Sequence, residues 1–191
     1  MPENIQRLLK GAWLTDNDIF AYLVLLKEKF PQIGGLEDPI ILQYSPKHIV
    51  KSEKYIRIVI CHENSHWVCI QGLDNSKNGD LVLYDSCKRS EIDKTLEKNI
   101  LNFIPEEKKK KGFINVILKN TQLQTRNLCG YFSLANATAM CFNLNPEFIK
   151  FDENELIKHY IDIVYNKKPI SMFPYQVVKR NLKRSILMFS L

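Results

Sequence analysis

The feature that most constrains this 191-residue chain is a cysteine at the head of a run of small residues. Cys129-Gly130 leads into residues 133–142, which are rich in alanine and other small side chains and predict a buried helix. At a helix N-terminus, unpaired N–H groups and the macrodipole favour a thiolate over a thiol. The pattern therefore indicates a nucleophile at Cys129. A small, buried, unreactive cysteine is the alternative.

The residues around Cys129 fit this chemistry. Gly130 lacks the side chain that would crowd an incoming peptide. Gln124 or Gln122, just upstream, can aim an amide N–H at an oxyanion beside the Cys129 backbone N–H. Both glutamines remain candidates at this point, and Gln124 is preferred.

Two further residues supply a base and a carboxylate. Residues 55–61 and 67–71 flank a short polar turn, which predicts a β-hairpin, and residues 81–85 predict the next strand. His66 opens the second of these strands and Asp85 closes the third. We therefore expect the imidazole and the carboxylate to lie on neighbouring strands, so that both can serve the thiol of Cys129.

In this order the motifs resemble the ubiquitin-like-protein-specific cysteine proteases, the group of the SUMO proteases, the deneddylase and, more distantly, the adenovirus-type protease. The resemblance covers about residues 13–175. It implies an α+β, papain-like fold of the SUMO-protease type in one catalytic domain, residues 1–191, with a central mixed or antiparallel sheet flanked by helices. The matching residues are Trp13-Leu14-Thr15-Asp16, His66-Trp67, Tyr84-Asp85-Ser86, Gln122, Gln124 and Cys129-Gly130-Tyr131-Phe132.

The resemblance also implies roles for these residues. Cys129, His66 and Asp85 would form the catalytic triad, and Gln124 would complete the oxyanion hole. Trp13 and Trp67 would be the walls of a channel that admits only a Gly-Gly backbone, with Gly130 beside it.

The chain also departs from the family. Leu128 stands where a polar or acidic residue is usual. Gln124 lies one residue closer to the cysteine than in SUMO proteases, whereas Gln122 has the spacing of the viral branch.

The function implied is hydrolysis of the bond after the C-terminal Gly-Gly of a ubiquitin-like modifier. SUMO is the first expectation, and the Nedd-type modifier and ubiquitin follow. One alternative is an adenovirus-type endoprotease that processes a viral or mobile-element polyprotein. Another is a modifier-binding module without turnover.

Composition limits the other classes of function. No apolar run reaches the roughly 18 residues of a membrane span, and the N-terminus does not resemble a signal peptide. Five cysteines without a CxxC pair favour a reducing compartment.

We expect a soluble intracellular monomer that needs no cofactor. It should lie in the cytoplasm or the nucleus, and these would be the compartments of a host cell if the protein is viral or bacterial. The net charge of +6 suits an acidic protein partner, but no base-reading motif indicates nucleic acid. The basic residues gather at residues 108–111 and at Lys179, Arg180, Lys183 and Arg184.

Four potential metal ligands, Cys61, His62, His66 and Cys69, lie within nine residues. Their spacing does not match a structural zinc site, and strand alternation should divide them between two faces. We therefore predict no metal. Cys61, Cys69 and Cys141 are expected to be core thiols, and Cys87 a thiol in a loop near Asp85.

Other elements follow from capping and periodicity. Thr15 and Asp18 predict a capping box for a helix that ends near Phe30. Residues 40–44 and 112–118 predict strands, and residues 90–93 predict the cap of a helix that runs to about Phe103. Residues 152–155 predict a capping box for a further helix through Val164. Residues 173–175 are expected to pack or turn, and the basic tail to be helical.

Overall fold

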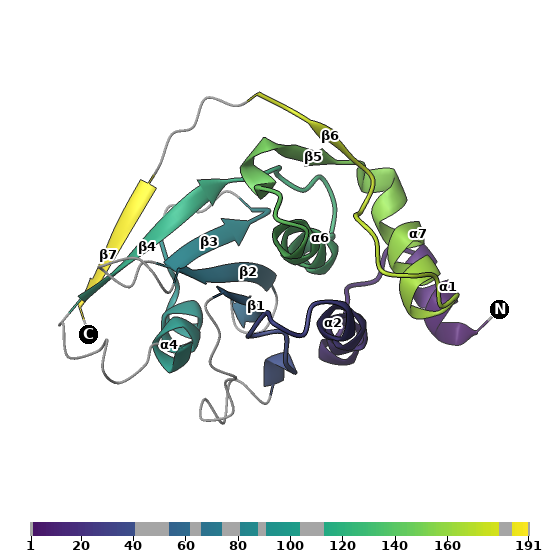
Figure 1. Cartoon of the computed structure of the whole chain (residues 1–191), viewed down its shortest axis with the longest axis horizontal. Helices are drawn as coiled ribbons and strands as arrows, with labels where there is room; N and C mark the ends of the chain where they lie inside the picture. The colour runs from purple at the N-terminus through teal and green to yellow at the C-terminus, as the bar shows by residue number, and fades with distance from the viewer. Residues whose placement is uncertain are drawn as a thin grey trace.

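A five-stranded sheet forms the centre of the computed structural model, which describes residues 2–40, 54–61, 66–73, 81–87, 91–103, 113–179 and 185–190. The strands lie in the order β1-β2-β3-β4-β7 (Figure 1). β3 and β4 run parallel, and the other neighbours are antiparallel, so the sheet is mixed. The strands are β1 (Lys54–Cys61), β2 (His66–Leu73), β3 (Leu81–Asp85), β4 (Phe113–Asn120) and β7 (Ser185–Ser190).

Both faces of the sheet are covered, because successive side chains of a strand point to opposite faces. On one face, Val68 and Ile70 of β2 pack with Leu96 and Ile100 of α4 (Lys94–Phe103). On the other face, Trp67, Cys69, Val82 and Tyr84 join a larger core that includes α6 (Cys129–Cys141). β3 is buried along its whole length, as expected for a strand between two layers.

Helix α6 is the buried helix predicted from the small-residue run, and all of its residues are buried. It lies between the sheet and the helices α2 (Asp16–Lys29) and α7 (Glu153–Val164) (Figure 1). Small side chains allow other elements to pack against every side of this helix. The sheet and α2 therefore hold the N-terminus of α6, and with it Cys129, in a fixed position.

The N-terminal helices are tied together by polar contacts. The predicted capping box is present, because Thr15 Oγ1 accepts a hydrogen bond from Asp18 N and Asp18 Oδ2 accepts one from Thr15 N. The same carboxylate pairs with Arg7 of α1 (Glu3–Leu9). Tyr160 of α7 donates to the Asp18 carbonyl at 2.8 Å. A local helix cap thus also joins three helices.

A small second sheet covers the start of α7. It pairs β5 (Ile149–Phe151) with β6 (Tyr175–Val177) in antiparallel register, and the 3-10 helix η2 (Pro146–Phe148) precedes it. Phe173 is buried, as the packing prediction for residues 173–175 requires.

The predicted hairpin is confirmed, since β1 pairs with β2 and Cys61 lies opposite His66. The strand predicted at residues 40–44 is wrong at its start, because Ile40 is helical. The amide of Ile40 bonds to Asp38 Oδ1, which favours a helical turn there. Residues 41–44 lie outside the described residues, as do His48, His62, the lysine run at 108–111 and the basic residues 180, 183 and 184.

Three other boundaries differ from the predictions. Helix α4 begins at Lys94, because Asp93 Oδ1 accepts from the amides of Thr95 and Leu96, so the cap is Asp93 and not the segment from residue 90. Asp152 caps α7 through Asn154 N, which is one position earlier than in a capping box. The tail is a strand at residues 185–190, because β4 offers it an edge to pair with.

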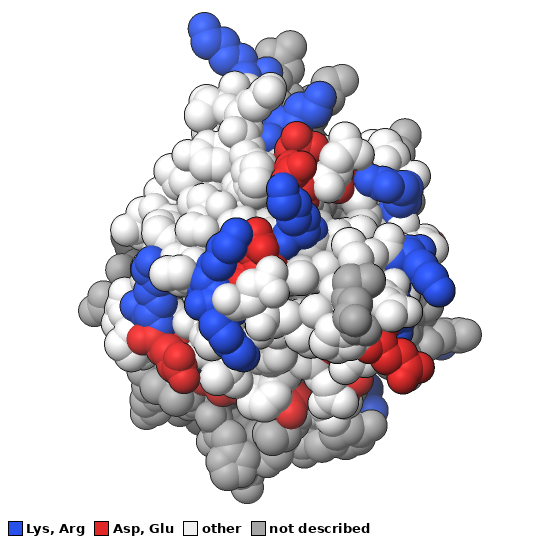
Figure 2. All heavy atoms as spheres, turned by 90° about the vertical axis from the view of Figure 1, so that its right-hand side faces the viewer, with Lys and Arg blue, Asp and Glu red and all other residues white. Residues whose placement is uncertain are grey.

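The described surface carries both signs of charge. Figure 2 shows the side of the molecule that holds α1 and α7, where basic and acidic side chains lie next to one another. Ion pairs here include Lys168 with Asp162, at 2.8 Å. Within the described residues, none of the helices combines the length and the apolar character needed to cross a membrane.

Candidate active site

The thiol of Cys129 lies at the first residue of α6, where the sequence predicted it. Leu128 is the N-cap residue and offers no side-chain cap, and the first turn has no acidic residue. The cysteine is 2% exposed. Its surroundings therefore combine unpaired helical N–H groups with low access to water, and both strengthen electrostatic interactions with a thiolate.

Gly130 fits closely against Leu14. A Cβ at this position would come within 3.0 Å of the Cβ of Leu14 and 3.1 Å of its Cδ1. The packing of Leu14 thus accounts for a glycine here. The role of Gly130 in admitting a peptide stays a prediction.

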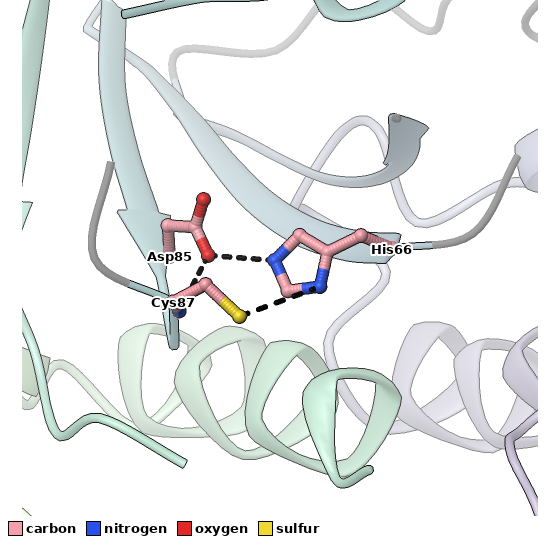
Figure 3. Close-up of side chains that lie close together, drawn as sticks. All are labelled: His66, Asp85 and Cys87. Carbon is pink, nitrogen blue, oxygen red and sulfur yellow. Dashed lines mark hydrogen bonds and ion pairs between the residues drawn. The ribbon is translucent and has the colours of Figure 1, made fainter. Parts of the chain in front are cut away.

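The imidazole of His66 is held by Asp85. Nε2 of His66 lies 2.7 Å from Asp85 Oδ1, and both side chains are buried. His66 is at the start of β2 and Asp85 at the end of β3. Because these neighbouring strands are antiparallel, the two residues lie at the same end of the strands. With Nε2 engaged, the ring turns Nδ1 toward the sulfur of Cys87 (Figure 3).

His66 also makes a side-chain hydrogen bond with Cys129. Burial lowers the pKa of His66, but the hydrogen bonds to Asp85 and Cys129, together with the negative charge of both groups, outweigh it and raise the pKa to about 9. The imidazolium is therefore the favoured form near neutral pH. The structure brings together the three side chains that the sequence singled out from distant parts of the chain.

The two candidate glutamines differ in their contacts. Gln124 Oε1 accepts a hydrogen bond from Ser86 Oγ at 3.0 Å, and Gln124 N donates to the Ser86 carbonyl at 2.8 Å. Ser86 directly follows Asp85, so these bonds tie the glutamine to the end of β3. Because the amide oxygen is occupied by Ser86, the carboxamide orientation is fixed and its N–H₂ faces away from that hydroxyl.

Gln122 is engaged in structural contacts instead. Its Oε1 accepts from Phe151 N at 2.7 Å, and its Nε2 donates to Glu153 Oε1 at 3.2 Å. Both ends of the carboxamide thus join β5 to the N-terminus of α7. This arrangement favours Gln124 over Gln122 as the oxyanion donor.

The two tryptophans lie in different environments. Trp67 is 4% exposed, and its indole N–H donates to the carbonyl of Leu14 at 2.9 Å. Trp13 is 40% exposed and directly precedes Leu14. Leu14 therefore contacts Trp67 through its carbonyl and lies against Gly130 with its side chain. The segment of residues 13–14 is placed beside the head of α6.

Cys87 lies near Asp85, as the sequence predicted, but its contact with His66 was not predicted. It is half-buried, its Sγ lies 3.9 Å from His66 Nδ1, and its backbone N–H donates to Asp85 Oδ1 at 2.8 Å (Figure 3). Two thiols, Cys87 and Cys129, thus flank one imidazole. Extension of the β2–β3 register places residue 87 opposite residue 66, so the pairing of the strands was the signal that could have found it.

The metal-ligating set considered from the sequence is not the one the structure assembles. Cys69 is completely buried in the core, where burial raises the pKa of its thiol, while His66 faces Asp85. The side chains of Cys61 and His62 lie outside the described residues. Within the described part of the chain, the group of three or more potential metal ligands is His66, Asp85 and Cys87.

A cavity of about 350 Å³ opens beside the site. It is lined by Ser86, Cys87, Leu123, Gln124 and residues 125–127. It adjoins the exposed side chain of Leu123. The cavity thus reaches Cys87, whose sulfur lies 3.9 Å from His66 Nδ1.

No protein-family model and no curated protein matches the sequence. Solved structures do match. The SUMO protease Ulp1, with its catalytic cysteine oxidised to a sulfinic acid, superposes with a TM-score of 0.62 at 15% identity, over 84% of this chain and 82% of that chain. The chain has the fold of the SUMO proteases. The predicted α+β fold class is confirmed.

Two other SUMO-protease structures support the same fold. The catalytic domain of a Ulp1-like SUMO protease from Chaetomium thermophilum gives a TM-score of 0.50 at 16% identity, over 80% of this chain and 71% of that chain. A de-sumoylating protease gives 0.50 at 12% identity, over 85% and 71%. Because identity is this low, the likeness is one of backbone arrangement.

Proposed function

We propose that this protein is a cysteine peptidase that hydrolyses the peptide or isopeptide bond after the C-terminal Gly-Gly of a ubiquitin-like modifier, with SUMO as the first candidate. The observation that carries the proposal is the position of His66, hydrogen-bonded to Asp85 through Nε2 and to Cys129. The SUMO-protease fold supports it independently of these side chains.

The first chemical step uses the thiol and the imidazole. Asp85 orients the ring and stabilises its protonated form, so His66 takes the proton from Cys129 and leaves a thiolate. The thiolate at the head of α6 attacks the carbonyl carbon of the glycine. Burial of His66 and Cys129 lowers the local dielectric and thereby strengthens the ion pair.

The tetrahedral intermediate needs donors for its oxyanion. The Cys129 backbone N–H and the Gln124 amide supply them, and Ser86 fixes the Gln124 carboxamide through its oxygen. In other enzymes, removal of one such donor lowers kcat about 10²–10³-fold. Gln124→Ala is expected to have an effect of this size. Gln122→Ala, which removes the contacts to Phe151 and Glu153, should mainly reduce stability.

The imidazolium completes the cycle. His66 gives its proton to the departing amine, which is the lysine ε-amine of a conjugate or the α-amine of a precursor. Water then hydrolyses the thioester, with His66 as base. A pKa of about 9 keeps His66 protonated at neutral pH, where an amine leaving group needs an acid.

The segment of Trp13 and Leu14 supports the proposed substrate class. The Trp67 indole N–H donates to the Leu14 carbonyl, Trp13 precedes Leu14 and is exposed, and the Leu14 side chain lies against Gly130. Two indoles tied to the segment that packs on the head of α6 suit an extended backbone without side chains, such as Gly-Gly. We therefore favour a modifier tail over a general peptide.

The test uses modifiers whose C-terminal glycine carries an electrophile. SUMO, the Nedd-type modifier and ubiquitin are incubated separately with the reduced protein, and adducts are read by intact mass. A single adduct is expected with wild type and none with Cys129→Ala. Cys141→Ala is the matched control, because Cys141 is a buried thiol at the other end of α6.

The outcomes separate the candidate functions. An adduct that persists in Cys129→Ala would refute the nucleophile. A protein that forms no adduct but cleaves Gly-rich peptide sites would be the polyprotein-type endoprotease. A folded protein that binds a modifier without adduct or cleavage would be a silent binding module.

A further inference from the structure

We propose that Arg7 is a positioning residue, which holds the backbone of Trp13 in place and thereby sets how tightly the protein binds a modifier tail. The first part concerns the protein without substrate, whereas the second part rests on the proposed function. Arg7 lies on α1, which packs against α7 and away from the central sheet (Figure 1). It thus acts on the site from the other end of the molecule.

The guanidinium of Arg7 joins two acceptors. Its Nη1 donates to the Trp13 carbonyl at 2.7 Å, and its Nη2 donates to Asp18 Oδ2 at 2.5 Å. A guanidinium presents its N–H donors in one rigid plane, so that one contact orients the other. The buried carboxylate of Asp18 therefore directs the second arm of Arg7 at Trp13.

The end of α1 fixes the backbone of Arg7. Gly11 N donates to the Leu8 carbonyl and Ala12 N donates to the Arg7 carbonyl, which is the Schellman pattern of a helix C-terminus. Gly11 has a φ of 80°, as this pattern requires. Arg7 thus contacts the segment after α1 twice, at Ala12 through its carbonyl and at Trp13 through its side chain.

The next residue, Leu14, is held by other elements. Its carbonyl accepts a hydrogen bond from the Trp67 indole at 2.9 Å, and its side chain lies where a Cβ on Gly130 would meet it at 3.0 Å. The sheet and α6 therefore fix Leu14, whereas α1 fixes the carbonyl of Trp13. Loss of the Arg7 side chain should release Trp13 and leave Leu14 in place.

The release of Trp13 should affect binding more than chemistry. Trp13 is exposed, so the position of its indole depends on how its backbone is held. A side chain that is not ordered beforehand must be ordered on binding, which lowers affinity. The side-chain hydrogen bonds of Arg7 go to Trp13 and Asp18, so the thiol and the imidazole of the site should keep their reactivity.

The first test observes Trp13 without a substrate. The chain has two tryptophans, so fluorotryptophan labelling gives two fluorine signals in magnetic resonance, and Trp13→Phe assigns them. In Arg7→Met, the Trp13 signal should move toward its position in the unfolded protein. The Trp67 signal should stay, because its indole is bound to Leu14. Lys10→Met, which removes a positive charge from the C-cap of the same helix, should leave both signals unchanged.

The second test measures labelling of Cys129 by the electrophilic modifier over a range of modifier concentrations. Arg7→Met should raise the concentration that gives half the maximal rate by about tenfold. The maximal rate, and alkylation of Cys129 by iodoacetamide, should change less than about twofold. Lys10→Met is the matched control, because it removes an equal charge that could attract an acidic modifier.

A double-mutant cycle separates positioning from direct contact. If Arg7 acts through Trp13, Arg7→Met should have no further effect on labelling once Trp13→Ala is present. Arg7→Lys is a second variant that retains a charge for Asp18. Its single ammonium lacks the second arm for Trp13, so it should weaken labelling as Arg7→Met does while thermal unfolding stays near that of wild type.

Three results would overturn the proposal. The first is a Trp13 fluorine signal that is the same in Arg7→Met and in wild type. The second is a loss of labelling in Arg7→Met that is equally large with and without Trp13, since Arg7 would then contact the modifier itself. The third is an equal loss in Lys10→Met, which would indicate an effect of net charge. If no modifier labels the wild type, the proposed function fails, and the fluorine signals still decide whether Arg7 holds Trp13.

Discussion

Replacement of Asp85 by asparagine tests the electrostatic basis of the site. The asparagine would keep the size of the side chain but remove the charge that faces His66 Nε2 at 2.7 Å. The variant therefore loses the charged hydrogen bond to Asp85 that helps to raise the pKa of His66 to about 9. Burial, which lowers this pKa, remains, and so do the hydrogen bond and the charge of Cys129, which raise it. The pKa of His66 should therefore fall from about 9 toward its ordinary value of 6.5.

The size of the effect follows from these two values. At pH 8, a group with a pKa of about 9 is about 90% protonated, and one with a pKa of 6.5 is about 3% protonated. A complete fall to 6.5 would leave about thirtyfold less imidazolium at this pH, and the remaining contact with Cys129 makes this value the upper limit. In the wild type, kcat/KM should decline as the pH rises through about 9, since the acid for the departing amine is lost. In Asp85→Asn this decline should begin at a lower pH than in the wild type.

The same pKa predicts how stability depends on pH. A group whose pKa is raised on folding stabilises the folded state most when it is protonated in both states. The contribution of His66 is therefore fully present below about pH 6.5, and it is lost as the pH rises through about 9. Asp85→Asn should flatten the pH dependence of the unfolding midpoint over this window.

Nuclear magnetic resonance measures the titration directly, without a substrate. The imidazole signals are followed from pH 5 to about pH 10, and His66→Gln assigns the signal of interest. His159 on α7 is an internal control, because burial lowers its pKa and it lies against the Ser171 carbonyl. Its titration should be the same in both proteins. A His66 signal that still titrates near pH 9 in Asp85→Asn would refute the assignment of the shift to this carboxylate.

Other substitutions test the packing that positions the site. Gly130→Ala should cost about 1–3 kcal/mol in the free energy of unfolding, because the new methyl group meets Leu14 at 3.0 Å; an unchanged urea midpoint would contradict this close fit. Lys119→Met should lower the free energy of unfolding by about 3–5 kcal/mol, because it removes the ammonium group that lies 2.6 Å from the buried carboxylate of Glu147. The double variant with Glu147→Leu should recover most of this loss, as measured by thermal unfolding. Thr15→Ala should cost about 1 kcal/mol through loss of the α2 cap, with Thr15→Ser as the conservative control; equal denaturation midpoints for the two would argue against the cap.

Much of the secondary structure was legible in the sequence because its causes are local. The cap of α2 depends on Thr15 and Asp18, three residues apart, and the β1–β2 hairpin depends on two apolar runs beside a short turn. α6 was predicted because its run of small and apolar residues has no charged side chain, which suits burial on every side. The two errors have different causes. At residue 40 a local hydrogen bond to Asp38 favours a helical turn in an apolar run, whereas at residues 185–190 pairing with the distant strand β4 decides for a strand.

Part of the candidate site could likewise be predicted from the sequence, and part could not. Cys129, His66 and Asp85 were found from their residue types, their order and the ends of the elements that carry them. The roles of Gln122 and Gln124 could not be separated by spacing, because the difference lies in their contacts with Phe151, Glu153 and Ser86.

The sequence by itself determined the helix that carries the cysteine and the strands that carry the histidine and the aspartate. It also determined the resemblance of these motifs, in their order along the chain, to the ubiquitin-like-protein-specific cysteine proteases. Only the tertiary structure decided that Cys87 faces the same imidazole as Cys129, and that Leu14 lies over Gly130. The physical reason is that helix caps and turns depend on neighbours within a few residues. The contacts of Cys87 and Leu14 depend on strand order and register, which bring residues together from distant parts of the chain.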